Sequence, residues 1–183
     1  MQMNFRCSPG FTLTELAVVL AVIAVIATFS APSFVMWHKR DQVDARARAM
    51  LFTLTLARSE AIRCGARVTL CRIDAARACL LSGKACDGGL TDWACGWALF
   101  FERDGGRVLM RMQPALAGVA VAGNGSELSF TPPSGQMIGG FSSFDFSARD
   151  GALASFGARG RRCTRIAAGG RARLTQSACG ATA

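Results

Sequence analysis

A long apolar run near the start of the chain limits its fold more than any other feature of the sequence. Between Phe11 and Trp37 the only formally charged residue is Glu15. As an α-helix this segment rises roughly 40 Å at about 1.5 Å per residue, which exceeds the ~30 Å hydrocarbon core of a bilayer. Residues 11–37 therefore predict one transmembrane helix, and the 183-residue length leaves room for one further domain.

The residues on either side of this helix do not fix its orientation by charge alone. His38, Lys39 and Arg40 follow it, whereas residues 1–10 carry only Arg6. Short basic segments are normally retained in the cytoplasm. A secretory signal peptide would have an apolar run of about 7–15 residues with its cleavage site after the run. Here the apolar run is longer and begins directly after Gly10, so any cleavage motif lies before the run and not after it.

The segment Gly10-Phe11-Thr12-Leu13-Thr14-Glu15 resembles the type IV prepilin signature. This resemblance implies that a prepilin peptidase removes residues 1–10 by cutting after Gly10, and that it methylates the new amine of Phe11. It also implies a single-pass protein of the inner membrane with a periplasmic domain, which enters a pilus filament after assembly. Pro9 and Cys7 depart from the more polar, basic leader that is usual in this class.

Glu15 is the candidate assembly residue. A carboxylate one turn into a membrane helix is costly unless it is neutral or paired. The resemblance supplies a partner, the N-terminal amine of Phe11 on a neighbouring pilin or pseudopilin subunit. The alternative is an acid that only favours the N-terminal end of the helix dipole.

The helix is expected to continue beyond the membrane. Apolar residues recur at three- to four-residue spacing or its multiple in residues 38–64, among many charged ones, which predicts an amphipathic half. Gly65 supplies a C-terminal stop after Cys64. Pro32 removes one helical hydrogen bond and, as in pilins, is expected to loosen the helix. A separate soluble helix after a break at Pro32 is the alternative.

Residues 65–183 predict a β-rich periplasmic domain. Short apolar or alternating runs occupy residues 67–73, 96–101, 108–112, 127–131, 141–146 and 162–167, with Gly-Gly, Asn-Gly and Pro-Pro turns at 105–106, 124–125 and 132–133 between some of them. The expected fold class is therefore α+β and pilin-like, with a long N-terminal helix packed on an antiparallel β-sheet.

Three segments of this half resemble the GspH/FimT family of minor pilins and pseudopilins. They are residues 56–61 at the expected helix end, residues 92–97 with their two tryptophans, and residues 128–135 with a later strand and turn. Trp93 and Trp97 lie four residues apart, so on a regular strand they face the same side. We expect both to pack in the core rather than to contact a ligand.

The eight cysteines, seven after removal of the leader, suggest an oxidising compartment such as the periplasm. The chain has no C-x-x-C pair and one histidine, which argues against a zinc site, and no cofactor is expected. We favour three local disulfides, although the sequence does not fix their connectivity, and expect the remaining Cys64 to be buried. The favoured pairs are Cys71 with Cys79, Cys86 with Cys95 and Cys163 with Cys179.

Positive charge gathers at the end of the chain. Of the net charge of +9, residues 151–183 contribute six arginines and no acid. The basic segment 159–179 suits a polyphosphate, because arginine forks match phosphate oxygens. Gly170-Arg171-Ala172-Arg173 resembles the G-R-x-R element of FimT-type minor pilins, which implies double-stranded DNA as a partner. The candidate residues are Arg161, Arg162, Arg165, Arg171 and Arg173. A solvated or filament-facing surface is the other interpretation.

The sequence favours a structural protein over an enzyme, because the usual acid/base and nucleophile motifs are missing. Three functions remain open. The chain is a minor pilin of the initiation or tip complex of a type IV pilus, the same subunit with DNA binding for natural transformation, or a GspH-like pseudopilin of a type II secretion system.

Overall fold

The computed structural model describes residues 12–80, 84–86, 89–103 and 105–180. Two compact units divide the chain, Met1–Trp37 and His38–Ala183. One helix, α1 (Leu13–Cys64), begins in the first unit and ends in the second. It continues without interruption through Pro32, so a separate helix after this proline is not what forms. The expected leader and Phe11 lie outside the described residues.

The described residues of the first unit form no apolar core of their own. Within this unit, Leu13–Ser30 has a mean hydropathy of 2.3 and none of its residues is buried. Among the described residues this is the one helix that is long and apolar enough to cross a membrane. Its large apolar side chains, such as Val18, Ile23 and Phe29, are all exposed. Such a surface needs lipid or other apolar helices around it.

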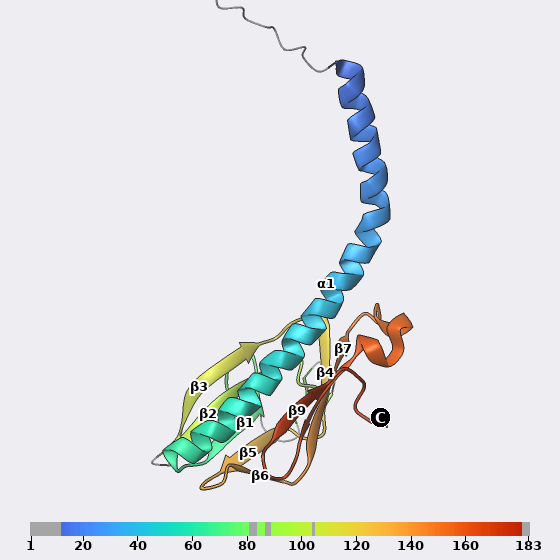
Figure 1. Ribbon diagram of the computed structural model, residues 1–183. Coiled ribbons are helices and arrows are strands. Elements are labelled where there is room, and N and C mark those ends of the chain that lie inside the picture. Colours follow the sequence, from blue (N-terminus) through green and yellow to red (C-terminus); the bar gives the residue numbers. More distant parts are fainter. Residues whose placement is uncertain (1–11, 81–83, 87–88, 104, 181–183) are drawn as a thin grey trace, which may run out of the picture. The chain divides into compact units, whose positions relative to one another are not determined.

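The second unit contains two antiparallel sheets (Figure 1). The first has the order β3-β2-β1-β5-β6 and the second the order β4-β7-β8-β9. The strands of the first sheet are β1 (Val68–Arg72), β2 (Gly96–Arg103), β3 (Gly106–Pro114), β5 (Glu127–Thr131) and β6 (Gln136–Ile138). Those of the second are β4 (Val119–Gly123), β7 (Ser142–Ala148), β8 (Arg162–Ile166) and β9 (Ala172–Thr175), with the 3-10 helix η1 (Ala154–Gly160) between β7 and β8.

The C-terminal half of α1 lies across the sheets and forms the core with them (Figure 1). Its buried stripe recurs at helical spacing, which places these residues on one face. They are Val43, Ala47, Met50, Leu54, Ala57 and Ala61. Side-chain contacts reach both sheets. Thr53 accepts a hydrogen bond from the ring nitrogen of Trp97 on β2 at 3.3 Å, and Asp44 pairs with Arg162 on β8 at 2.7 Å.

The helix ends where the sequence predicts, but the cysteine at its end is not buried as expected. Gly65 has a φ of +60°, the left-handed conformation that commonly stops a helix and that glycine adopts without strain. The expectation that Cys64 is buried is wrong. Cys64 is exposed and unpaired, and its thiol contacts the carboxylate of Glu60 on the solvent side of the helix.

The two tryptophans lie in the core, as predicted, but not on one strand face. Trp97 belongs to β2, whereas Trp93 precedes a turn before that strand. The ring nitrogen of Trp93 donates to the Gly125 carbonyl at 2.7 Å, and its ring meets that of Phe144 edge-on with centroids 4.9 Å apart. Trp93 therefore packs toward the second sheet, while Trp97 packs against α1.

Three strands and η1 are not apparent from the sequence. Strands β4, β6 and β9 have three to five residues each. β4 and β9 are rich in alanine, glycine or polar side chains, and β6 has only three residues. Such short segments form because a longer neighbour pairs with them, as β7 pairs with all of β4. Their formation depends on long-range pairing more than on local preference.

Candidate functional site

The start of α1 holds the candidate assembly residue in a local hydrogen-bonded cap. The backbone N–H and the hydroxyl of Thr12 both donate to Oε2 of Glu15 at 3.0 Å. In return the Glu15 N–H donates to the Thr12 hydroxyl oxygen at 3.3 Å. This reciprocal pair is a capping box, which satisfies backbone donors at a helix start. Among the described residues, Oε1 of Glu15 accepts no hydrogen bond.

Three of the five candidate arginines lie together on the outer face of the second sheet. Arg165 on β8 stands directly opposite Arg173 on β9. Arg171 precedes β9 by one residue and is two residues from Arg173, so extended backbone directs both side chains the same way.

These three side chains border a hollow of ≈ 390 Å³. It is lined by Phe141, Arg165, Ala167, Arg171, Arg173 and Thr175. Within the part of the chain that the structure describes, the three guanidinium groups make no hydrogen bond and no ion pair. We call Arg165, Arg171 and Arg173 the arginine cluster.

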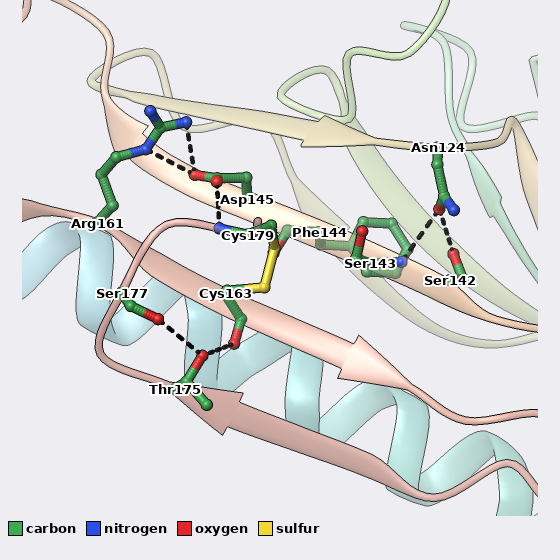
Figure 2. The surroundings of a disulfide bond; sticks show 10 residues. All are labelled: Asn124, Ser142, Ser143, Phe144, Asp145, Arg161, Cys163, Thr175, Ser177 and Cys179. Carbon is green, nitrogen blue, oxygen red and sulfur yellow. Dashed lines mark hydrogen bonds and ion pairs between the residues drawn. A yellow bond between two sulfur atoms is a disulfide. The ribbon is translucent and has the colours of Figure 1, made fainter. Parts of the chain in front are cut away.

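Arg161 differs from the arginine cluster because it has an acidic partner. Its Nε donates to Oδ1 of Asp145 on β7 at 2.9 Å (Figure 2). The other oxygen of Asp145 accepts a hydrogen bond from the backbone N–H of Cys179 at 2.7 Å. Much of the positive charge of Arg161 is thereby neutralised within the chain.

Arg162 is not a surface residue, and its inclusion among the DNA-binding candidates is wrong. It follows Arg161 in the chain, so its side chain points to the other face of the sheet, toward α1. Only 4% of it is exposed, and its Nε donates to Oδ1 of Asp44 at 2.7 Å. Burial opposes ionisation of Asp44, but hydrogen bonds from Arg162 and Arg48 outweigh it and hold its pKa below the ordinary value.

The structure contains the three disulfides that the sequence favours. Cys71 pairs with Cys79, Cys86 with Cys95, and Cys163 with Cys179. The last of these ties the segment after β9 back to β8 (Figure 2). With the Cys179–Asp145 hydrogen bond, it holds the end of the described chain against the outer face of the second sheet. The β8–β9 hairpin that carries the arginine cluster is therefore covalently closed.

The glycine of the G-R-A-R segment has a packing role. Gly170 has a φ of +73°, and a Cβ added to it would lie 2.1 Å from the carbonyl oxygen of Gly135. The same Cβ would come within 3.3 Å of the Arg58 side chain on α1. The hairpin turn therefore packs against the turn before β6. The N–H of Met137 on β6 donates to the carbonyl oxygen of Ala168, between β8 and β9, at 3.0 Å, and this hydrogen bond joins the two sheets.

Sequence reasoning missed Phe141 as a residue of this surface. It immediately precedes β7 on the same side of the sheet as Arg165, and the residue is 59% exposed. The sequence contains one signal for it, an isolated phenylalanine between Gly140 and two serines. Among the described residues, no group of three or more histidine, cysteine or acidic side chains is arranged to hold a metal ion.

An apolar N-terminal helix that continues into a domain of antiparallel sheets defines a pilin-like protein, a minor pilin or pseudopilin. A prokaryotic N-terminal methylation motif matches residues 6–31. The GspH family, described as "Type II transport protein GspH", matches residues 46–170, and the chain belongs to this family.

Solved structures show the same fold. Two crystal forms of the type IV minor pilin FimU from Pseudomonas aeruginosa (strain PAO1) are similar to this chain. One has a TM-score of 0.55 at 18% identity, covering 76% of this chain and 92% of the FimU chain. The other has a TM-score of 0.52 at 17% identity, covering 72% and 91%. At these identities the likeness concerns the fold. No curated protein matches the chain in sequence.

Proposed function

We propose that this chain is a minor pilin that enters the initiation or tip complex of a type IV pilus through the N-terminal half of α1. The observation that carries the proposal is the apolar segment Leu13–Ser30, none of which is buried within the chain. Before assembly, inner-membrane lipid surrounds it, with the β domain in the periplasm. After assembly, the equivalent helices of other subunits replace the lipid.

Glu15 has a defined part in this proposal. Cleavage after Gly10 makes Phe11 the first residue. Its methylated amine is positively charged, and the amine of a neighbouring subunit is the partner we propose for Glu15. A carboxylate in an apolar filament core requires such a partner, because an unpaired charge there is strongly unfavourable. Oε1 of Glu15 is open to this amine while Oε2 stays in the capping box with Thr12.

Two variants separate assembly from helix capping. Glu15→Gln keeps an oxygen that can accept from Thr12 but removes the charge, whereas Thr12→Val removes the capping hydroxyl and keeps the charge. We expect both full-length chains to be processed after Gly10 and to reach the membrane. Glu15→Gln should reduce the amount in sheared filaments at least about tenfold, the effect of ~1.4 kcal/mol, while Thr12→Val is incorporated normally.

The assembly role of Glu15 is refuted if Glu15→Gln enters filaments as well as the wild type. Equal defects in both variants would instead assign Glu15 to helix capping. N-terminal sequencing of the membrane-bound chain, with mass measurement of the methyl group, checks that processing is unchanged.

A GspH-like pseudopilin of a type II secretion system is the alternative machine, favoured by the description of the family. The open arginine cluster favours the pilus, because a surface for an anionic polymer outside the cell is useful on an extracellular filament. Deletion of the gene distinguishes the two. Loss of surface pili with normal export of folded proteins supports the pilus, and the reverse result supports secretion.

DNA binding for uptake in natural transformation is a second proposed function. The arginine cluster supports it, because its three guanidinium groups are unpaired among the described residues and lie on one face. Contacts of this kind release counterions, so affinity falls steeply with salt. Arg171→Ala with Arg173→Ala should make the negative slope of log affinity against log salt shallower by about 1.8, from about 0.9 for each of two lost phosphate contacts.

The control removes equal charge elsewhere. Arg67 and Arg107 are about half exposed and lie 3.8 Å from the carboxylate of Glu102. Replacing both with alanine should leave duplex binding nearly unchanged in a mobility-shift assay of the full chain in neutral-lipid nanodiscs. DNA binding is rejected if the wild-type chain shifts no duplex at low salt. Its assignment to the arginine cluster is rejected if the two double variants weaken binding equally.

A further inference from the structure

The hollow beside the arginine cluster has an aromatic wall as well as a charged one. Phe141 lines it together with Arg165, Arg171 and Arg173. This residue is 59% exposed, although an aromatic side chain gains more by burial than almost any other. An exposed phenylalanine next to guanidinium groups that have no partner among the described residues is suited to a ligand with a flat ring between two anionic groups.

The backbone that carries Phe141 is held in place by a neighbouring turn. Asn124, directly after β4, accepts hydrogen bonds through Oδ1 from the Ser142 hydroxyl at 2.6 Å and from the Ser143 N–H at 3.1 Å (Figure 2). Its Nδ2 donates to the Phe141 carbonyl at 3.4 Å. Three bonds from one side chain therefore fix the start of β7, and the ring is presented from an ordered backbone.

The spacing of the charges suits a chain of anions rather than one small anion. Arg171 and Arg173 are two residues apart on extended backbone, about 6.6 Å along the strand. Arg165 stands across the ladder from Arg173, with Cβ atoms about 5 Å apart. Asp145 lies on this face and is already bound by Arg161 and by the Cys179 N–H, so little of its negative charge is left to repel an anionic ligand.

A base inside a duplex cannot reach this ring. Its two faces are covered by neighbouring bases, and exposing one requires the nucleotide to leave the stack. In a single strand the base faces are accessible, and proteins commonly bind such strands with a basic groove and an aromatic platform. The hollow, at ≈ 390 Å³, is within the usual size range of small-ligand pockets.

We infer that this hollow binds an unpaired nucleotide of single-stranded DNA, with the base stacked on Phe141 and the flanking phosphates on the arginine cluster. The inference rests on the proposed DNA binding and specifies its ligand. An acidic polysaccharide offers negative charge but no aromatic ring, so it is the less suitable occupant and serves as a competitor in the test.

The test compares probes that differ in one property each. The full chain without its leader, in neutral-lipid nanodiscs, is titrated with oligo-dT, with an abasic phosphodiester strand of equal length, with a duplex closed at both ends by non-nucleotide linkers, and with polygalacturonate. Stacking of one base should make oligo-dT bind between about 5- and 100-fold more tightly than the abasic strand.

Phe141→Leu keeps an apolar side chain and removes the ring. It should bring the ratio of the oligo-dT and abasic affinities close to one and leave duplex affinity unchanged, whereas Phe141→Trp preserves the ratio. Phe156→Leu is the matched control, because Phe156 is also exposed but lies on η1 and does not line the hollow. Equal thermal unfolding of the variants shows that the fold is intact.

The inference is overturned if the wild type binds the abasic strand as tightly as oligo-dT, or if Phe141→Leu leaves their ratio unchanged. Polygalacturonate that binds as tightly as oligo-dT and depends on Phe141 would also overturn it, in favour of an acidic glycan. Salt-dependent duplex binding without any base effect rejects only this inference. Failure to bind any of the nucleic-acid probes rejects the proposed DNA function as well.

Discussion

Replacing Arg162 with methionine tests whether this arginine joins the helix to the second sheet or belongs to the exposed surface. Its side chain is 4% exposed. It donates to Asp44 at 2.7 Å and to the carbonyl oxygens of Arg159 and Arg161 at 3.0 and 2.9 Å. Methionine fills a similar volume but leaves all three acceptors without this donor.

The expected loss of stability follows from these contacts. Removing one partner of a buried ion pair costs about 3–5 kcal/mol, because the other charge remains buried. The carboxylate of Asp44 is 20% exposed and keeps Arg48 at 2.6 Å, so the lower end applies, about 3 kcal/mol. For a domain of this size that loss lowers Tm by about 6–12 °C.

The effect should depend on pH in a defined direction. Because the pKa of Asp44 lies below its ordinary value in the folded chain, its contribution to stability is present above the unfolded pKa and is lost as pH falls through the folded pKa. The Tm difference between wild type and Arg162→Met is therefore largest at neutral pH and narrows below about pH 4.

Thermal unfolding of the oxidised full chain in one detergent, followed by circular dichroism, measures this difference. Arg165→Met is the matched control, because Arg165 lies on the same strand but faces outward without a partner among the described residues. It should change stability by about 0.5 kcal/mol or less. A loss below about 1 kcal/mol for Arg162→Met, or equal losses for both variants, would refute the assignment.

Two further predictions concern a glycine and a thiol. Gly170→Ala should lower stability by at least about 2 kcal/mol, because alanine is strained at positive φ and its Cβ meets the Gly135 carbonyl. Gly169→Ala is the control and should change stability little, because a Cβ there has open space around it. Equal Tm values for the two variants would contradict this packing. A maleimide should label one cysteine of the processed, oxidised native chain, and peptide mapping should identify it as Cys64; protection of Cys64 until denaturation would contradict its exposure.

Local patterns in the sequence predicted much of the fold. The charge-free run after Glu15 and the apolar spacing beyond the membrane segment both describe α1, whose bounds depend mainly on neighbours within a few residues. The strand prediction for residues 127–131 coincides with β5, because its alternation is regular and a turn precedes it. Strands β4, β6 and β9 were missed because their partners, rather than their own residues, determine them.

Part of the candidate site could likewise be predicted from the sequence, and part could not. Period-two spacing places Arg171 and Arg173 on one side of β9, which the sequence can show. Arg161 and Arg162 are neighbours of equal charge in the sequence, yet one lies on the surface paired with Asp145 and the other is buried against Asp44. Phe141, which directly precedes β7, joins the arginine cluster at the hollow although it is distant from these arginines in the sequence.

The sequence by itself determined the apolar helix, the motif at Gly10 and Phe11, and a set of cysteines spaced for local pairing. These features depend on composition and on neighbours close in the chain, so they are readable without coordinates. Only the tertiary structure decided which arginines are free, because Asp44 lies 118 residues before Arg162 and meets it only when α1 packs on β8. It alone brought Phe141 to the arginine cluster, since hydrogen bonding between strands, and not sequence order, sets which side chains share a face.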